Sequence, residues 1–375
     1  MIVSVRPPVL IVGAGPTGLA AALFLVQRGV AVRIIDAAPA PTTTSKALLV
    51  NPRTLEILHD SGVAARIMTE GTRLTGACLH RGTKLVASLD VLALLPGQPL
   101  IGLAQARTEA LLTEALQTQG ATVERGVSLQ TLHQDAECVT LTLQHADGRI
   151  ENTSAALVFG ADGARSTVRH QLGLAFEGSA FPEPWRLWDV QLQTTLDPQR
   201  VHIVFLPDGF MFLMALQDDV WRVLGNSADP LAQLPASSVP GRICWQSEFH
   251  IAHRLVSRVC VQRVALGGDA AHIHSPLGAR GMNLGIEDAW VFAACAADAL
   301  DGGLQRIREY GQLREVVHHE VVKKIAAMTR LMRGKPAALA RIREWTIPQL
   351  VKLPSVRKQM AATIAGMDHP LRTHL

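Results

Sequence analysis

The sequence predicts an α/β fold in which a mainly parallel sheet is assembled from three separated stretches of the chain. Residues 9–27 read as a short apolar strand, a glycine turn and a helix, and apolar strands at 157–160 and 261–266 also run into glycine and aspartate. Short alternating segments between these stretches indicate an inserted, mostly antiparallel sheet. After Gly281 the pattern is helical almost to the end, so C-terminal helices complete the fold.

The first unit has the order strand, helix, strand. The β-branched run at 9–12 leads into the glycine turn, and the helix that follows extends to Gln27. A second strand at 31–35 ends at Asp36, and a loop rich in Pro and Thr leads to a helix beginning near Pro52. This is a βαβ unit of ordinary length, the building block of a Rossmann-type sheet.

The middle of the chain predicts a change from parallel to antiparallel structure. Leucines at helical spacing predict an amphipathic helix at 108–119. Alternation over 122–157, with a turn at Asp147-Gly148, predicts an antiparallel ribbon, and 185–225 contains further strands. A connection rich in helix and strand breakers follows at 235–240.

The C-terminal region is basic as well as helical. We expect its helices to be interrupted at Gly302-Gly303, at 334–336 and at Pro348. From Asp301 onward there are 14 Lys and Arg against 6 Asp and Glu, although the whole chain carries a formal charge of only +4. Such a region fits contact with acidic lipids, an anionic substrate or a partner protein, and it equally fits a solvated helical face.

The composition, 48% hydrophobic and 18% charged over 375 residues, is that of a globular protein. Five widely spaced cysteines without a CxxC pair favour neither a disulfide framework nor a zinc site, and they suit a reducing cytoplasm. No block of Lys and Arg is interleaved with aromatics, which argues against nucleic-acid binding. The longest apolar run, 19–26, is too short to span a bilayer, so we expect a soluble cytoplasmic protein without integral membrane association.

Gly13, Gly15 and Gly18 fit the pattern G-x-G-x-x-G after a strand and at the start of a helix. The first glycine permits a tight turn, the second lets a pyrophosphate approach the backbone, and the third lets helix and strand pack closely. The helix N-terminus favours negative phosphates, and Asp36 is placed to accept hydrogen bonds from ribose hydroxyls. These residues alone are compatible with FAD and with NAD.

A second aspartate turn follows the strand at 157–160, in the segment Phe159 to Arg169. Asp162 can hold this turn by hydrogen bonds to its own backbone or meet a ribose. Arg165 and Arg169 carry charges that can meet phosphate.

The third turn lies in the segment 267–285, where small residues surround Asp269 and let the backbone approach a flat ligand. The helix after Gly281 directs its positive N-terminus at the same place, which suits a ring that becomes anionic on reduction. His272 and His274, two residues apart and without a third ligand, are more typical of local hydrogen bonding than of catalysis or a metal site.

In this order and at this separation, the three segments resemble the aromatic-ring hydroxylases of the para-hydroxybenzoate hydroxylase type, over about 330 residues. In that family the first motif binds the ADP half of FAD, the second is associated with FAD and NAD(P)H, and the third lies along the ribityl chain and the N1–C2 edge of the flavin. The resemblance implies a discontinuous Rossmann-type FAD-binding domain at 1–74, 101–178 and 259–300, a mostly antiparallel substrate-binding domain at 75–100 and 179–258, and a helical region at 301–375.

The resemblance also carries individual residues. Gln105, just before a helix, resembles a flavin-contacting position, and Arg107 is a neighbouring candidate. Lys46 stands where the family usually has an Arg on the FAD phosphates and so lacks the bidentate fork, and Ala279 stands where a Gly is frequent, which tightens flavin movement. The cofactor-binding residues implied are Gly13, Gly15, Pro16, Thr17, Gly18, Asp36, Ala37, Lys46, Gln105, Asp162, Gly163, Arg165, Gly268, Asp269, Pro276, Gly278, Ala279, Gly281, Met282 and Asn283.

The function implied is a monooxygenase in which NADH or NADPH reduces FAD and O2 forms a C4a-hydroperoxide that hydroxylates a phenolic or related aromatic substrate. The sequence identifies no group that activates the substrate. Tyr310, the only tyrosine, is expected in a C-terminal helix, and His202, His250 and Arg222 are more typical of structural residues. Aromatic and Met side chains at 188–221 either line an apolar pocket or alternate between the two faces of a sheet. The family also suggests a homodimer.

Three other functions stay open. The segment Pro184 to Trp188 is superficially similar to the WxWxIP signature of flavin halogenases, but its spacing differs and the Ile-Pro is missing. A flavin dehydrogenase or reductase without oxygen insertion would carry the same glycine motifs. So would a non-catalytic flavin-binding protein, which only an assay of turnover would separate from an enzyme.

Overall fold

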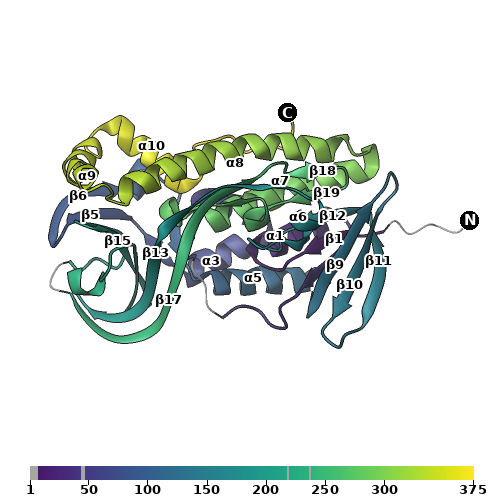
Figure 1. Ribbon diagram of the computed structural model, residues 1–375, viewed down its shortest axis with the longest axis horizontal. Coiled ribbons are helices and arrows are strands. Elements are labelled where there is room, and N and C mark those ends of the chain that lie inside the picture. The colour runs from purple at the N-terminus through teal and green to yellow at the C-terminus, as the bar shows by residue number, and fades with distance from the viewer. Residues whose placement is uncertain (1–6, 44–46, 218, 236–237) are drawn as a thin grey trace, which may run out of the picture.

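The computed structural model describes residues 7–43, 47–217, 219–235 and 238–375. Two sheets lie towards opposite ends of its long axis, with β1 and β12 at one end and β5 and β15 at the other (Figure 1). The long helix α8 (Gln305–Met332) runs along one side and extends from one sheet towards the other, and α7 (Gly281–Gly302) lies between α8 and α1 (Figure 1).

The first sheet has six strands in the order β18-β19-β12-β1-β2-β8. Its parallel core is formed by strands from three separated stretches, as the sequence predicts: β1 (Val9–Val12), β2 (Val32–Asp36), β8 (Val123–Arg125), β12 (Leu157–Gly160) and β19 (Val264–Leu266). Every residue of β1 and β12 is buried, because helices and loops cover both faces of the sheet. The single strand expected at 261–266 is in fact a short hairpin, in which β18 (Cys260–Val261) pairs antiparallel with β19.

Helices pack around this sheet in a continuous apolar core. Helix α1 (Pro16–Val26) buries nine residues and packs against both α7 and α5 (Gln105–Thr118). The ribbon predicted at 122–157 is a separate antiparallel sheet at the edge of the domain. Its strands are β9 (Val127–Gln134), β10 (Val139–His145) and β11 (Ile150–Ala155). The remaining elements before β8 are β3 (Leu49–Val50), α2 (Pro52–Ile57), η1 (His59–Ser61), α3 (Val63–Glu70), β4 (Thr72–Leu74), α4 (Val91–Leu94) and β7 (Leu100–Gly102).

The second sheet has eight strands and is mostly antiparallel. Its order is β20 (His272–Ile273), β17 (Val239–Val256), β13 (Phe176–Gln193), β16 (Val220–Gly225), β15 (Gly209–Gln217), β14 (Arg200–Leu206), β5 (Gly76–Arg81) and β6 (Lys84–Asp90). The 18-residue strands β13 and β17 sweep in a long curve around this end of the molecule (Figure 1). Together with the parallel sheet and the C-terminal helices, this insert confirms the predicted fold class.

The C-terminal region is helical, as predicted, with breaks after Gly302 and after Met332. The break expected at Pro348 is wrong, because α9 (Ala337–Leu350) continues through it and α10 (Pro354–Ala365) begins four residues after α9 ends. Pro348 lies in the last turn of α9, so only the final residues of the helix follow the hydrogen bond that its missing N–H removes. Among the described residues, no helix combines the length and the apolar character needed to cross a bilayer.

Candidate cofactor site

The three turns predicted from the sequence meet at one edge of the parallel sheet. The carboxyl ends of parallel strands lie at the same edge, and backbone hydrogen bonds join the turns there. Gly13 N donates to Ile35 O at 2.8 Å, Ala161 N to Val12 O at 2.8 Å, and Gly267 N to Gly160 O at 3.0 Å. Segments more than 250 residues apart in sequence therefore form one continuous surface of glycine-rich backbone.

In the first turn, contacts within the protein require two of the three glycines, and the third lies beside open space. Gly13 has a φ of +102°, and a Cβ there would overlap the carbonyl oxygen of Ala161. A Cβ on Gly18 would overlap the carbonyl oxygen of Gly13, so this glycine allows α1 to pack closely. Gly15, by contrast, has no atom within 4 Å of the position that its Cβ would occupy. The protein does not fill this space, which is where the motif places a pyrophosphate.

Asp36 lies at the end of β2, beside the first turn. Its Oδ2 accepts a hydrogen bond from Ala14 N at 2.6 Å, and its Oδ1 accepts one from Ala38 N at 2.7 Å. Arg125 on β8, which the sequence analysis missed, places Nη1 3.5 Å from Oδ2. The carboxylate keeps lone pairs for a ribose hydroxyl and is 18% exposed, while its neighbour Ala37 is exposed.

In the second turn, Asp162 holds its own backbone. Its Oδ2 accepts from Val168 N at 3.1 Å, and Ser166 caps α6 (Thr167–Gln171) by accepting from the N–H of Arg169 at 3.0 Å. The Oδ1 of Asp162 is buried and has no partner among the described residues, and burial raises the pKa of this carboxyl. Gly163, at a φ of +79°, turns the chain, and Arg165 is exposed beyond it.

Arg169 does not reach a phosphate site, so that expectation is wrong. Its side chain is buried, donating from Nη1 to Ala270 O at 3.0 Å and from Nη2 to Ala164 O at 2.8 Å. Its guanidinium carbon also lies 3.9 Å from the centre of the Phe176 ring. Arg169 therefore fastens the second turn to the third, a role that depends on contacts the sequence does not reveal.

In the third turn, Gly268 lies against the first helix. Its N–H donates to Asp288 Oδ2 at 2.9 Å, and a Cβ on Gly268 would contact Thr17 Oγ1. The third turn and α1 therefore pack through small atoms. Asp269, the next residue, is exposed at the same sheet edge.

Asp288 on α7 is buried behind this turn and accepts hydrogen bonds from several segments, although no local sequence pattern points to it. Besides Gly268 N, it accepts from His272 Nε2, His318 Nε2 and Arg314 Nε, each at 2.7 Å. Burial raises the pKa of Asp288, but His318, Arg314 and His272 outweigh it and hold the pKa well below its usual range. Contrary to expectation, His272 does lie beside two further potential metal ligands, Asp288 and His318. Arg314, however, already donates to the same carboxylate.

His274 has no charge near neutral pH. Burial lowers its pKa to about 3, and its Nδ1 lies 2.8 Å from Ser275 O. It is therefore a neutral, locally bonded side chain, as the sequence suggested.

The loop before α7 has an unusual backbone. Gly278 has a φ of +77°, and Ala279 has a φ of +53°, which is rare for a residue with a Cβ. The Asn283 side chain fixes the start of α7: its Oδ1 accepts from Asn51 N and Thr54 Oγ1, and its Nδ2 donates to Leu49 O and Ala279 O. The Asn283 side chain therefore joins the start of α7 to the segment around α2. Its partners Asn51 and Thr54 were not expected from the sequence.

At the start of α7, the groups available to a ligand are backbone N–H groups. The first N–H groups of a helix have no partner inside it, and here they belong to Gly281, Met282 and Asn283. Beside Gly281, the nearest atom to a built Cβ is His274 Cε1 at 3.9 Å. Pro276 opens the loop that leads to this helix end.

The residues near α5 are less suited to a cofactor than expected. Gln105 donates its amide to Glu109 Oε1 at 2.8 Å, although its backbone lies at the helix start beside Ala47. Arg107 pairs with Glu70 at 2.6 Å and with Glu114 at 2.9 Å in a surface network, so its flavin-contacting role is not supported. Lys46 lies outside the described residues.

Tyr310 lies behind the third turn, and the remaining sequence candidates lie in the second sheet. Tyr310 is on α8, as expected, and its hydroxyl donates to Leu266 O at 2.7 Å. His202 Nδ1 lies 3.1 Å from His80 Nε2 inside the second sheet, and His250 is exposed on β17. Arg222 forms a buried bidentate pair with Asp189, at 2.7 and 2.8 Å.

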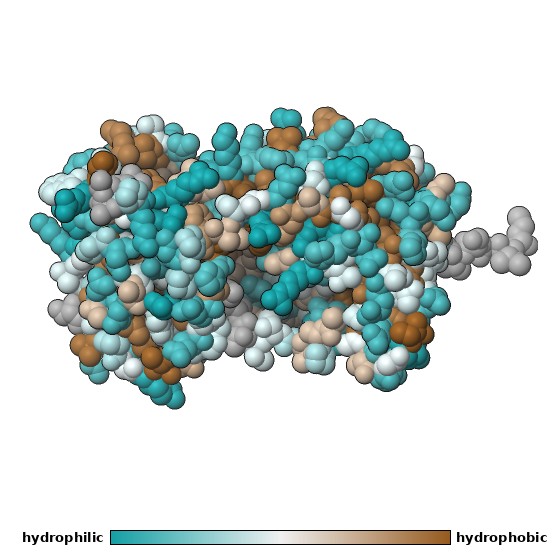
Figure 2. Space-filling model, in the orientation of Figure 1, coloured by the Kyte–Doolittle hydropathy of each residue, from teal (hydrophilic) through white to brown (hydrophobic). Residues whose placement is uncertain are grey.

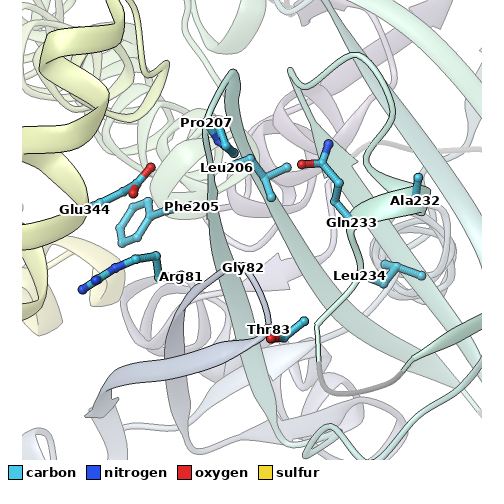
Figure 3. Close-up of a pocket in the computed structure, with 10 residues that line it drawn as sticks. All are labelled: Arg81, Gly82, Thr83, Phe205, Leu206, Pro207, Ala232, Gln233, Leu234 and Glu344. Atoms are coloured by element: carbon cyan, nitrogen blue, oxygen red, sulfur yellow. The ribbon is translucent and has the colours of Figure 1, made fainter.

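The molecular surface is hollowed between the two ends of the molecule (Figure 2). A cavity of about 440 Å³ lies elsewhere, where Arg81 and Phe205 face Glu344 of α9 across from Gln233 and Leu234 (Figure 3). A second, of about 520 Å³, lies between β13, β17 and α8. Neither cavity is lined by residues of the first turn.

The sheet edge fits a dinucleotide. Gly15 offers backbone with open space above it, Asp36 a carboxylate beside the same turn, and α7 a helix N-terminus directly after the third turn. The open space at Gly15 carries the most weight, because the other two glycines of the motif are explained by contacts within the protein.

Comparison with known proteins supports this assignment. A family model described as an FAD binding domain matches residues 6–215 and 217–325. The chain is 37% identical to 6-methylpretetramide 4-monooxygenase of Streptomyces rimosus over 319 residues, covering 79% of this chain and 56% of that protein. It is 31% identical to pentachlorophenol 4-monooxygenase of Sphingobium chlorophenolicum over 394 residues, covering 98% and 72%. The chain thus spans little more than half the length of the first relative.

Two solved structures show the same fold. The p-nitrophenol 4-monooxygenase of Pseudomonas putida DLL-E4 superposes with a TM-score of 0.87 at 22% identity, covering 97% of this chain and 98% of that one. The anhydrotetracycline hydroxylase of Streptomyces rimosus superposes with a TM-score of 0.78 at 29% identity, covering 97% and 77%. The chain therefore belongs to the FAD-binding family of flavoprotein monooxygenases, the aromatic hydroxylases of the para-hydroxybenzoate hydroxylase type.

Proposed function

We propose that this protein uses FAD, NADH or NADPH, and O2 to hydroxylate a phenolic or related aromatic substrate. The observation that carries the proposal is the convergence of the three turns at one sheet edge, with open space at Gly15 and a helix start after the third turn. Bound FAD supplies the hydride acceptor and, once reduced, the centre that activates O2. The chain's own residues bind and orient it.

The first turn would hold the ADP half of the cofactor. The N–H groups at the start of α1 favour the pyrophosphate, and Asp36 would accept from a ribose hydroxyl while it also fixes Ala14. Asp269, exposed at the same edge, would meet the ribityl chain. The N–H groups of Gly281 to Asn283 would face the flavin ring, where they stabilise negative charge on the reduced form.

The insert would supply the substrate side. The sheet face that carries Phe210 and Leu224 packs against Leu277 of the third segment, so an apolar surface adjoins the flavin loop. Arg222 lies on this same sheet face, because it is two residues from Leu224 in β16. Asp189 and Met214 lie directly opposite Arg222 in the neighbouring strands and so share the face. We therefore propose that the chain divides into an FAD-binding part and a substrate-binding part with the bounds predicted from the sequence.

The reductant would bind at the cavity between β13, β17 and α8. Arg254, Lys323 and Arg330 line it together with Glu177 and Glu320, and the three cations suit the phosphates of NADH or NADPH. The strand pairing of Arg254 with Ile273 places this cavity one strand away from the third turn. Either nicotinamide cofactor satisfies this charge pattern.

The test is turnover by FAD-loaded protein in air, with NADH or NADPH consumption and peroxide release followed across a panel of phenols and quinolones. We expect one compound to stimulate consumption, with little peroxide and a product heavier by one oxygen atom in mass spectrometry. Stimulated consumption that ends entirely as peroxide would show effector binding without productive chemistry. A bound flavin without consumption would favour a dehydrogenase with another electron donor or a non-catalytic protein.

A further inference from the structure

An exposed apolar ridge runs along α9. Ile342, Trp345 and Leu350 are 57%, 64% and 46% exposed, and Leu353, in the turn after the helix, is 49% exposed. The spacing of three and five residues keeps Ile342, Trp345 and Leu350 on one side of the helix, and Leu353 follows three residues after it ends. Apolar side chains gather over this corner of the molecule (Figure 2), where α9 and α10 lie (Figure 1). Single exposed apolar residues are ordinary, whereas three along one helix face with a fourth in the next turn indicate an interaction surface.

The opposite side of α9 is firmly attached to the protein. The guanidinium of Arg343 is buried and donates from Nη2 to Leu206 O at 2.9 Å and to Gly209 O at 3.0 Å. On the ridge side, the guanidinium carbon of Arg81 lies 4.1 Å from the centre of the Trp345 ring. The helix is therefore held with its apolar side outward, and its exposure does not come from a detached end.

The charge around the ridge is strongly positive. Residues 333–358 contain seven Lys and Arg and a single acid, Glu344; Glu183 pairs with Arg333 and Lys335, and Arg343 is buried, which leaves Arg341, Lys352, Arg357 and Lys358 around the ridge. Arg341 on α9 and Lys352 in the turn after it are both exposed. Lys358 on α10 is exposed as well. A rigid apolar ridge thus lies beside a row of cations.

We propose that α9 and the turn after it dock the protein on the surface of a lipid bilayer that contains anionic headgroups. Trp345, Leu350 and Leu353 enter the boundary between headgroups and acyl chains, and the basic flank meets the lipid phosphates. This is peripheral attachment, which requires no spanning helix. The inference stands apart from the proposed catalytic function and can be tested without turnover.

Charge complementarity selects the bilayer over two other occupants. A second copy of this chain would bring two faces of the same positive charge together across a twofold axis. Nucleic acid would engage the cations, but it offers no apolar surface for Ile342, Leu350 and Leu353. A bilayer with anionic headgroups satisfies both halves of the surface.

The experiment is co-sedimentation of the full-length, FAD-loaded protein with vesicles of phosphatidylcholine alone or mixed with phosphatidylglycerol. We expect binding to the mixed vesicles that falls with added salt. The double change Trp345→Ser and Leu353→Ser should weaken it at least about tenfold. The double change Arg341→Gln and Lys352→Gln should weaken it about fivefold for each charge removed. FAD content and thermal unfolding of the variants establish that they are folded.

Ile150→Ser and Arg149→Gln are matched controls, because these residues are also exposed but lie on or beside β11, at the other end of the molecule. Both should bind the mixed vesicles like the unchanged protein. Failure of the unchanged protein to bind, or equal loss in the controls, overturns the proposal. So does a dimer in light scattering that Trp345→Ser dissociates, or duplex DNA binding without vesicle binding.

Discussion

His369 Nε2 lies 2.7 Å from Glu287 Oε2, and this buried contact fastens the C-terminal segment to α7. The Nδ1 of His369 lies 3.3 Å from Asp368 Oδ1. Arg280, the residue immediately before α7, is buried in the same group, with Nη1 3.7 Å from Asp368 and Nη2 3.8 Å from Glu287. The last residues of the chain therefore help to position the helix start that is proposed to face the flavin.

The first prediction concerns the pH dependence of this contact. Burial lowers the pKa of His369, but the bonds to Asp368 and Glu287 outweigh it and raise the pKa above its ordinary value. The pKa of Glu287 is lowered, because His369, Arg314 and Arg280 outweigh its burial. The stabilisation from His369 is full below its unfolded pKa of about 6.5 and is lost as pH rises through the folded pKa, while that from Glu287 is lost in acid. The contact should be strongest between about pH 4.5 and 6.5.

We therefore expect His369→Gln to lower the free energy of unfolding by about 3 kcal/mol at pH 6, and by less at pH 9. Urea unfolding of FAD-loaded protein at the two pH values measures the difference. His374→Gln is the control, because His374 is exposed, and it should stay within about 0.5 kcal/mol at both values. An effect of His369→Gln that grows towards pH 9 would contradict the assigned charge state.

The second prediction separates two glycines of the first turn. Gly15→Ala should leave the unfolding of FAD-free protein within about 0.5 kcal/mol of the original, because its Cβ meets no protein atom and its φ is −75°. It should weaken FAD binding about tenfold or more, since the methyl group occupies the ligand's space. Gly13→Ala should destabilise the FAD-free protein by several times the ~1 kcal/mol that a positive φ alone costs.

Fluorescence titration with FAD and chemical unfolding measure these two effects. Gly29→Ala, also at positive φ but with open space around its Cβ, should show only the smaller backbone cost. If Gly15→Ala binds FAD normally, the space above Gly15 is not the cofactor site.

The third prediction concerns Asp36. Asp36→Ala removes a carboxylate that fixes Ala14 N and Ala38 N, so we expect FAD to bind about 10-fold to 100-fold more weakly, the range for hydrogen bonds to a charged group. Asp36→Asn should lose less, because the amide oxygen keeps one acceptor. Equilibrium dialysis against FAD measures the change, with the exposed Asp60→Asn as control. Equal affinities for all three variants would exclude Asp36 from the site.

The fourth prediction concerns the reductant. Arg254→Gln should raise the KM for NADH or NADPH about tenfold while FAD content stays unchanged, since Arg254 lines the cavity between β13, β17 and α8 and not the three turns. Steady-state oxidation of NADH or NADPH in air, in which O2 reoxidises the flavin, measures this KM without an aromatic substrate. Arg149→Gln, exposed beside β11 and outside the lining of this cavity, should leave the KM unchanged. A fall in FAD content with an unchanged KM would show that Arg254 contributes to binding FAD and not the reductant.

Local sequence determined the parallel core and the three turns. Short apolar strands that end in Gly and Asp have few other structures available, since Gly13, Gly163 and Gly268 adopt positive φ that other residues resist. The predicted strand at 157–160 agrees with β12, and the helix after Gly281 with α7. Chain order and spacing were then enough to identify the family, because the three motifs together are far more specific than any one of them.

Tertiary structure alone decided what the polar side chains do. Arg169, Asn283 and Arg107 look like ligand contacts in sequence, but their partners are protein groups: carbonyl oxygens for Arg169, backbone and Thr54 for Asn283, and acids from two helices for Arg107. Asp288 joins residues 268, 272, 314 and 318, and His369 meets Glu287 across 82 positions. A local pattern fixes backbone conformation because that depends on neighbouring residues. The partner of a long polar side chain depends on which segments the fold brings within 3 Å, and that is decided only when the core packs.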